Sequence, residues 1–436
     1  MAIVRDDLPK LVDAENGTVS PSIFTDWEIY KLELERVFNR SWLFVAHESE
    51  IPRPGDFVTR RMGSERVIVS RGTDGEVHVM LNACRHRLRP VCLEDAGQTA
   101  HFGCPYHGWT YTVSGELVGV PFFDAYEGRL DMGANGLYHA PRVDTYHGLV
   151  FASWDAHAGP LLECLGSLAW VFDLLFGRTG SMEVVGPPMR WTVPSNWKLG
   201  AGNFAGDGHH VAVTHGFISA LGMKNARGRS VSYVVPGDHG HLANLGGWPP
   251  GGNVGPFLAL PNAIWPEMEQ RLSAEQFELM RALRVIAGNM FPNMSFLETA
   301  SPGAHEWGGP EGLDAMSFLT IRQWQPLRPD LMEVWTWQLM DASAPDWWKA
   351  ASRQCYLREF GAGGIFEQDD AANWASITHT LRAPAVGRLP LKYDMGLGSD
   401  ELMEWPGPGL VYSKPAVGEV SERLFYKHWH AVIQEA

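Results

Sequence analysis

Two short segments that each hold one cysteine and one histidine constrain this chain of 436 residues more than any other feature. The first is Cys84-Arg85-His86, and the second, after seventeen intervening residues, is Cys104-Pro105-Tyr106-His107-Gly108-Trp109. The first segment follows a predicted strand at 76–81, and the second precedes a predicted strand at 109–113. Two such loops can hold a metal centre between their tips.

The same four ligands suit either a Cys₂His₂ zinc site or an iron–sulfur cluster. Zinc ribbons usually place two cysteines on one loop, whereas here each loop supplies one cysteine and one histidine. That arrangement favours a [2Fe–2S] cluster, with Cys84 and Cys104 on one iron and His86 and His107 on the other. Such a cluster relays electrons, and it cannot activate a substrate because all its ligand positions are filled. The remaining cysteines, Cys92, Cys164 and Cys355, are predicted to be buried apolar side chains.

The charge and the hydropathy of the chain argue against nucleic-acid and membrane partners. The chain has 35 basic and 50 acidic residues, a formal charge of −15, which disfavours nucleic-acid and anionic membrane surfaces. No apolar run reaches the roughly 18 residues that span a bilayer, and residues 1–15 are acidic where a secretory signal is basic. We therefore expect a cytoplasmic globular protein without nucleic-acid or membrane partners.

A second group of polar residues lies between Asn196 and His215. On a regular helix Asp207 and His210 share a face, but His210 and His215 are about 140° apart and cannot point at one metal. Glycines at 206 and 208 and β-branched residues at 211, 213 and 214 weaken helix formation. The sequence therefore predicts a broken or bulged helix at this segment.

Two histidines leave a divalent iron short of ligands and of negative charge. The segment Phe366-Glu367-Gln368-Asp369-Asp370 offers a carboxylate, and two histidines with one carboxylate form the facial triad of non-haem Fe(II) oxygenases. Spacing does not choose between Asp369 and Asp370. A His/Asp cluster taken alone is more often structural, but the neighbouring electron-relay motif favours iron. We expect His209 to point away from the face of Asp207 and His210.

The chain organisation predicts two structural units. A capping box at 25–28 opens an amphipathic helix with apolar residues through Trp42, hairpins are predicted at 67–81 and 109–120, and a strand at 148–154 precedes a breaker-rich boundary. Residues 40–156 then form a small all-β unit. A larger α+β unit follows, with a helix near 274–288, strands at 317–324 and 333–340, and long loops at 236–262 and 383–418.

These residues resemble a known family, the large (α) subunits of Rieske non-haem iron aromatic-ring-hydroxylating dioxygenases, in the biphenyl, phenylpropionate and polycyclic-hydrocarbon branch. The resemblance runs from residues 24–26 and 42–52 through both metal motifs to 364–370. It implies an α+β fold in which a Rieske [2Fe–2S] domain at 40–156 is inserted into a helix-grip catalytic domain, residues 1–39 and 157–436, built on an antiparallel sheet with helices.

The resemblance also implies roles for individual residues. It makes His210, His215 and Asp370 the ligands of a mononuclear iron, Asp207 an acid that bridges His210 to His107 of a neighbouring subunit, and Asn203 a polar residue beside the iron. The family's substrate pocket falls on Phe204, Gly208, Val211, Phe360 and Phe366. Two departures are Gly202, where many relatives carry an acid, and His209, where tyrosine is common.

The implied activity is addition of both atoms of O₂ to an aromatic ring, giving a cis-dihydrodiol. Electrons would come from NADH through a separate reductase and ferredoxin, since Gly200–Gly206 lacks the spacing of a dinucleotide-binding loop. The implied assembly is an α trimer, with or without β subunits (α3β3). The alternatives are a Rieske monooxygenase or demethylase, and a zinc-binding or electron-transfer protein without oxygenase activity. The sequence does not place a cation that would select carboxylated arenes over neutral ones.

Overall fold

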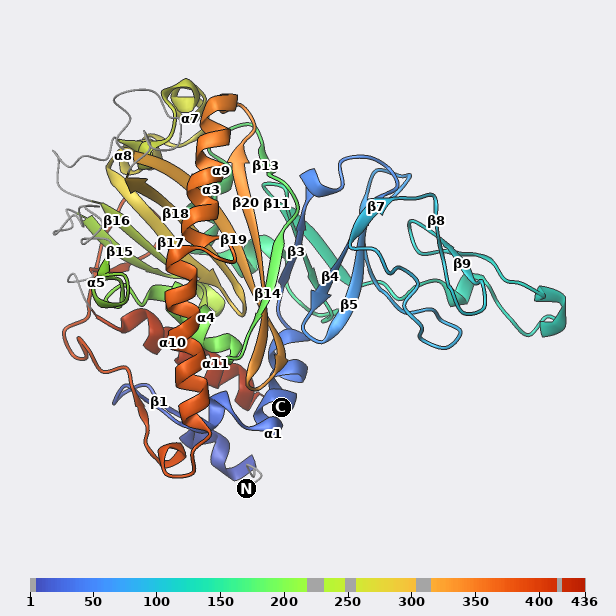
Figure 1. Cartoon of the computed structure of the whole chain (residues 1–436), viewed down its shortest axis with the longest axis horizontal. Coiled ribbons are helices and arrows are strands. Elements are labelled where there is room, and N and C mark those ends of the chain that lie inside the picture. The colour runs from blue at the N-terminus through green and yellow to red at the C-terminus, as the bar shows by residue number, and fades with distance from the viewer. Residues whose placement is uncertain (1–4, 218–230, 248–255, 303–314, 414–417, 436) are drawn as a thin grey trace. The chain divides into compact units, whose positions relative to one another are not determined.

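The computed structural model describes residues 5–217, 231–247, 256–302, 315–413 and 418–435 (Figure 1). The chain divides into two compact units, Phe38–Leu161 and the remainder. Among the described helices, none combines the length and apolar character needed to cross a bilayer.

The Phe38–Leu161 unit is built of short antiparallel strands. They form a four-stranded sheet, β6-β5-β4-β7, and two three-stranded sheets, β10-β9-β8 and β11-β12-β3. Their bounds are β3 Leu43–His47, β4 Asp56–Met62, β5 Glu65–Arg71, β6 Val77–Leu81, β7 Ala96–Gln98, β8 His101–Gly103, β9 Thr110–Thr112, β10 Leu117–Gly119, β11 Arg142–Tyr146 and β12 Leu149–Ser153. The hairpins β5–β6 and β9–β10 and the strand β12 confirm the prediction for this region.

The core of this unit lies beside the two Cys/His loops. Cys84 and Cys104 are both buried in one apolar cluster with Phe57, Trp109 and Tyr111. Close-packed aromatic rings keep water away from the thiol groups, and the two loops pack directly on this rigid core.

The larger unit is dominated by one antiparallel sheet, whose order is β13-β20-β19-β18-β17-β16-β15-β23-β22, with β14 also paired to β20. The bounds are β13 Met182–Val184, β14 Met189–Val193, β15 Val231–Pro236, β16 Leu242–Gly247, β17 Leu283–Met290, β18 Met294–Pro302, β19 Ala315–Arg328, β20 Leu331–Asp341, β22 Glu401–Met403 and β23 Val411–Ser413. The predicted strands at 317–324 and 333–340 lie within β19 and β20 and are confirmed.

Helices cover both faces of this sheet, and those that carry the site cover one of them (Figure 1). Trp324 of β19 contacts Phe204 of α4 (Trp197–Gly206) and Trp374 of α10 (Ile365–Leu381), and Phe318 contacts α9 (Asp346–Phe360). Residues of even number on β19 therefore face α4, α9 and α10, because side chains alternate along a strand. Phe172 of α3 (Ser167–Phe176) packs on Phe296 from the opposite face. The other helices are α1 Trp27–Leu32, α2 Leu161–Leu165, α5 Val211–Thr214, α7 Trp265–Arg271, α8 Ala274–Ala282 and α11 Val420–Gln434.

Three local predictions are wrong. The N-cap of α1 is Asp26 and not Thr25, since the Asp26 carboxylate accepts from the backbone N–H of Glu28 and Ile29. The helix also changes to π-helical geometry over Glu33–Phe38 and ends before Trp42. The helix predicted at 274–288 extends only to Ala282, because the chain then enters β17.

The two long stretches predicted as loops also contain strands. The first includes β16, and the second includes β22, β23 and β21 (Leu391–Lys392). Their strands are Gly-rich or very short, so they lack the alternation by which a strand is recognised. Residues 248–255 and 414–417 lie outside the described part.

Candidate metal centres

The two Cys/His loops are built in the same way. In each, the N–H of the cysteine donates to a carbonyl five residues ahead, Cys84 to Arg89 and Cys104 to Trp109, both at 2.8 Å. In each, the cysteine carbonyl accepts from the residue four ahead, at 2.8 Å from Leu88 and 3.0 Å from Gly108. Those two residues have left-handed φ values, +58° and +74°. The turns therefore match, although the histidine is two residues after Cys84 and three after Cys104.

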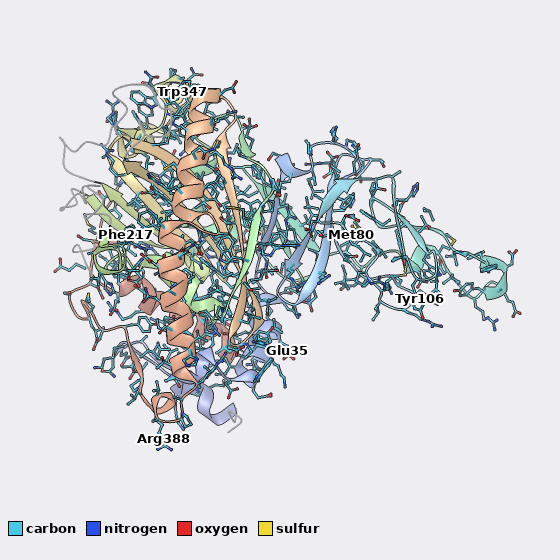
Figure 2. All side chains as sticks on the ribbon, viewed as in Figure 1. Glu35, Met80, Tyr106, Phe217, Trp347 and Arg388 are labelled. Carbon is cyan, nitrogen blue, oxygen red and sulfur yellow. The ribbon has the colours of Figure 1, made fainter. Side chains whose placement is uncertain are left out.

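The turns bring the two imidazoles together. The rings of His86 and His107 lie 4.5 Å apart between centroids, and Trp109 stacks on His86 at 5.1 Å with planes 7° apart. Tyr106, labelled in Figure 2, packs on His107 at 3.7 Å. On the sulfur side, the Tyr111 hydroxyl lies 3.3 Å from Cys84 Sγ, and burial raises the pKa of that thiol. Two thiols and two imidazoles thus converge from two loops.

The donor set fits a [2Fe–2S] group. The Nδ1 atom of His86 is buried and has no hydrogen-bond partner among the described residues, which is costly for an imidazole nitrogen unless a metal binds it. Neither Cys84 nor Cys104 is in a disulfide, so both sulfurs are available as ligands. A polar donor on one thiol, the Tyr111 hydroxyl, is also the kind of contact that tunes cluster potentials.

The predicted break in the second segment is present. Helix α4 ends at Gly206, and α5 begins at Val211, after a non-helical Asp207 with ψ of +74°. The break turns the chain so that His210 and His215, five residues apart, face the same point. Their rings are 5.2 Å apart between centroids.

Asp370 of α10 completes this group. Its Oδ1 lies 3.4 Å from His210 Nε2 and 3.3 Å from His215 Nε2, and one ligand atom from each of the three residues lies within 4.8 Å of the others. The Asp370 side chain is buried, whereas that of Asp369 is 39% exposed and lies 3.6 Å from His215 Nδ1. The structure therefore brings the second acid of the pair to the histidines.

The backbone fixes the orientation of His210. Its Nδ1 donates to the carbonyl oxygen of Asp207, which places the proton on Nδ1 and leaves the Nε2 lone pair facing Asp370. The Asn203 amide nitrogen lies 3.5 Å from the same Nδ1. A buried carboxylate, the buried imidazole of His215 and the half-buried imidazole of His210, with these surrounding contacts, are consistent with a mononuclear iron site.

His209 does not point away from Asp207, which corrects the sequence expectation. Its Nδ1 lies 3.2 Å from Asp207 Oδ1, and the break in the helix is the reason, since the 100° step of a regular helix no longer applies. Burial raises the pKa of the Asp207 carboxyl. The hydrogen bond to His210 and the charges of His210 and His209 lower that pKa by a larger amount, so it lies below its ordinary value. Asp207 therefore carries its charge at neutral pH.

The residues predicted to line a substrate pocket are only partly brought together. Phe360 and Phe366 stack at 5.4 Å with planes 17° apart, and Phe366 meets the edge of His215 at 4.8 Å. Phe204 is buried on α4 against Trp324, 5.4 Å away. Gly208 is half-buried in the helix break, and Val211 is 37% exposed on α5.

Sequence reasoning missed four residues that lie beside the predicted pocket residues or the His210, His215 and Asp370 group. Phe217, labelled in Figure 2, lies 6.0 Å from Phe366 and 6.3 Å from His215. The others are Trp324, Arg322 and Glu367, which pack around Phe204 and Phe360 or lie one turn before Asp370. Strand alternation on β19 could have put Arg322 and Trp324 on one face, but nothing local relates that face to α10.

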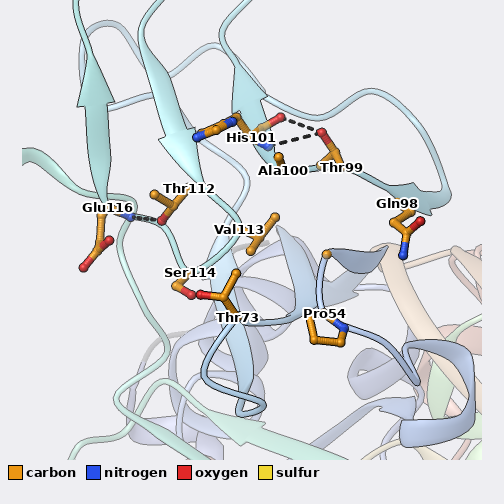
Figure 3. A pocket seen from close by; sticks show the side chains of 11 residues that line it. Pro54, Thr73, Gln98, Thr99, Ala100, His101, Thr112, Val113, Ser114 and Glu116 are labelled. Carbon is orange, nitrogen blue, oxygen red and sulfur yellow. Dashed lines mark hydrogen bonds between the residues drawn. The ribbon is translucent and has the colours of Figure 1, made fainter.

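A separate groove of about 600 Å³ lies in the Phe38–Leu161 unit (Figure 3). Its wall includes His101 and Glu116, whose backbone N–H groups are paired within the wall: Thr99 Oγ1 accepts from the His101 N–H, and Thr112 Oγ1 accepts from the Glu116 N–H. None of the candidate ligands lines it, so it is not part of either centre.

Comparison with known proteins agrees with this geometry. Residues 41–141 match the Rieske [2Fe-2S] domain family. The biphenyl 2,3-dioxygenase subunit alpha of Rhodococcus jostii is 36% identical over 440 residues, which cover 97% of this chain and 90% of that protein. The chain belongs to the α subunits of Rieske aromatic-ring-hydroxylating dioxygenases. The family predicted from the sequence is therefore confirmed.

Two further proteins are similar to this chain over nearly its full length. A crystal structure of naphthalene 1,2-dioxygenase from Rhodococcus sp. bound to indole superposes with a TM-score of 0.92 at 40% identity and covers 99% of this chain and 98% of that one. This dioxygenase α subunit therefore has the predicted α+β fold. The N,N-dimethyl phenylurea N-demethylase subunit alpha of Sphingobium sp. is 34% identical, over 97% of this chain and 94% of that protein.

Proposed function

We propose that this α subunit is a terminal oxygenase that adds both atoms of O₂ to a neutral arene and yields a cis-dihydrodiol. The observation that carries the proposal is the group His210, His215 and Asp370, which adjoins the aromatic pair Phe360 and Phe366. Three protein ligands leave coordination positions for O₂, and flat apolar rings suit an arene. We assign residues 40–156 to the Rieske domain and residues 1–39 with 157–436 to the catalytic domain.

In this proposal Cys84 and Cys104 would hold one iron of the [2Fe–2S] cluster, and His86 and His107 would hold the other. The cluster, when bound, supplies electrons one at a time. The chain itself positions the ligands through the matched turns and shields the sulfurs through the buried core. The stacked Trp109 and the Tyr111 hydroxyl hold the orientation of His86 and the hydrogen bonding of Cys84.

We assign the mononuclear iron to His210, His215 and Asp370, which supply two neutral nitrogens and one charge. Asp207 serves His210 twice, because its carbonyl holds the Nδ1 proton and its carboxylate lies 3.4 Å from the same atom. In a trimer the Asp207 carboxylate would also bridge to His107 of a neighbouring subunit. Asn203 is a polar neighbour of His210 in this arrangement.

Exposed apolar side chains support an assembly with other proteins. Large apolar side chains are exposed on and near the Cys/His loops, with Leu88 at 70%, Tyr106 at 59% and Phe122 at 89%. Exposed apolar clusters of this kind mark protein interfaces. We propose an α trimer, with or without β subunits (α3β3), that receives electrons from a ferredoxin and an NADH-dependent reductase.

N-Demethylation is the second candidate, because one of the similar proteins is a phenylurea N-demethylase subunit. Labelled oxygen separates the two reactions. We would supply the reconstituted enzyme with ¹⁸O₂ and either naphthalene or N,N-dimethyl phenylurea. A dihydrodiol carrying two labelled oxygens supports dioxygenation, while release of formaldehyde with no dihydrodiol from naphthalene would establish the demethylase.

The Asp207→Asn variant tests the bridging role. We expect both metal centres to stay loaded while steady-state turnover nearly disappears. The amide of asparagine carries no negative charge and has one acceptor oxygen in place of two, so it cannot replace the carboxylate bridge. A single turnover started from fully reduced protein separates electron supply from chemistry. Wild-type steady-state turnover in the variant would refute the role given to Asp207.

A further inference from the structure

A buried cation lies behind the aromatic pair of the candidate site. Arg322 of β19 is fully buried, on the sheet face that packs against α9 and α10. One guanidinium nitrogen pairs with the Glu367 carboxylate, and the other terminal nitrogen donates to the carbonyl oxygen of Phe360 at 3.1 Å. Arg322 therefore joins the last residue of α9 to the first turn of α10.

The same guanidinium lies over two of the predicted pocket rings. Its central carbon is 5.2 Å from the ring centroid of Phe204 and 4.9 Å from that of Phe360. Cations over ring faces are attracted most strongly when both are out of water, as here. The rings of α4 and α9 are thereby held against one rigid group, since a planar fork that binds a carboxylate and a carbonyl cannot rotate freely.

The anionic partner of Arg322 lies on the helix that carries the iron carboxylate. Glu367 and Asp370 are three residues apart in α10, so they share a helix face, and both are buried. A movement of Glu367 therefore moves Asp370. Through Arg322 the position of Asp370 is tied to the positions of Phe204 and Phe360.

We propose that Arg322 is a positioning residue that sets the arene walls relative to the iron carboxylate, and that it thereby determines which ring carbons are attacked. The proposal rests on the proposed dioxygenase function. Glu367 balances the charge of Arg322, and the Phe204 and Phe360 rings lie against its guanidinium, so we do not assign it to binding a carboxylated substrate. The predicted substrates remain neutral arenes.

A second buried arginine provides a matched control. Arg178 is as buried as Arg322 and also binds carboxylates, those of Glu298 and Asp341, but neither partner belongs to the candidate site. Substitution of lysine for arginine at either position keeps the positive charge but removes the planar guanidinium and its two-armed hydrogen bonding. A purely structural role predicts the same consequences for Arg322→Lys and Arg178→Lys.

The test uses the reconstituted enzyme with biphenyl and measures the ratio of regioisomeric dihydrodiols, the turnover, and the affinity of the iron-free protein for biphenyl by tryptophan fluorescence. For Arg322→Lys we expect a changed product ratio, turnover lower by roughly 10- to 100-fold, and weaker biphenyl binding, because a displacement of about 1 Å suffices for such losses. For Arg178→Lys we expect a lower unfolding temperature with the wild-type product ratio.

The double variant Arg322→Met with Glu367→Met repeats the test without leaving a buried lone charge. If both Arg322 variants keep the wild-type product ratio and biphenyl affinity, or if neither folds, the positioning role is wrong and the pair is only structural. A preference for 2-naphthoate that the double variant abolishes would make Arg322 a carboxylate-binding residue and also overturn the proposal. Absence of any dihydrodiol from the wild-type enzyme would instead refute the proposed function.

Discussion

The substitution Gly200→Ala in α4 should lower the stability of the fold, although alanine favours helices more than glycine does. A Cβ atom at Gly200 would lie 2.6 Å from Cε3 of Trp324 and below 3.0 Å from two more atoms of that indole. Trp324 cannot retreat, since it is fully buried, donates to Ser295 Oγ at 2.8 Å and meets Trp374 edge-on at 5.3 Å. Helix α4 must therefore move away from the sheet.

Gly202, two residues along the same helix, is the matched control. Among the described residues, a Cβ there would meet the end of the Tyr426 side chain, with the hydroxyl oxygen at 3.3 Å and Cζ at 3.8 Å, which is a tight but tolerable contact. Each Gly→Ala change gains about 1 kcal/mol of helix propensity, whereas overpacking at Gly200 costs about 1–3 kcal/mol. We expect Gly202→Ala to be neutral or stabilising and Gly200→Ala to be about 1–3 kcal/mol less stable than it.

The assay is thermal unfolding of both variants under identical metal loading, together with naphthalene turnover. Because α4 carries Asn203 and Phe204 and ends beside Asp207, its displacement should also lower turnover in Gly200→Ala. If Gly200→Ala raises the unfolding temperature as much as Gly202→Ala, the tight packing of α4 on Trp324 is wrong.

Three further predictions follow from the two centres and the core. Asp370→Ala should lose the mononuclear iron and all turnover while the visible spectrum of the cluster persists; retained iron would contradict the ligand assignment. Tyr111→Phe should lower the cluster reduction potential, measured by redox titration, because a hydrogen bond to the Cys84 sulfur is lost. Burial lowers the pKa of His241 from 6.5 to about 3, so the unfolded state gains a proton first as pH falls. Stability is full above about pH 6.5 and falls by about 2 kcal/mol by pH 5, and His241→Asn, compared by urea unfolding at both pH values, should lose that dependence.

The two Cys/His loops could be predicted from sequence because each lies within one short segment. Each loop joins a cysteine and a histidine within four residues, and strands at its edge leave it little freedom. The helix break before His210 was likewise predictable from Gly206 and Gly208. Such features depend on backbone preferences that a short segment carries by itself.

The side chains around the candidate iron-binding group could not be predicted in this way. Arg322 and Glu367 are 45 residues apart, and only the pairing of β19 with its neighbours and the packing of α10 across it bring them together. His209 illustrates a different failure: once the helix breaks, helical angles no longer say where its ring points. The end of α8 at Ala282 shows a third, because the apolar pattern continues into β17 and the change of element is set by the sheet.

The central claim is that one chain holds a Rieske cluster and a separate mononuclear iron. The most direct measurement is the EPR spectrum of the anaerobically dithionite-reduced protein, combined with iron and zinc analysis of the same sample. We predict the rhombic signal of a reduced [2Fe–2S] centre with histidine ligands and iron in excess of the cluster by one ion per chain. A colourless, EPR-silent protein that holds only zinc after reconstitution would contradict the account.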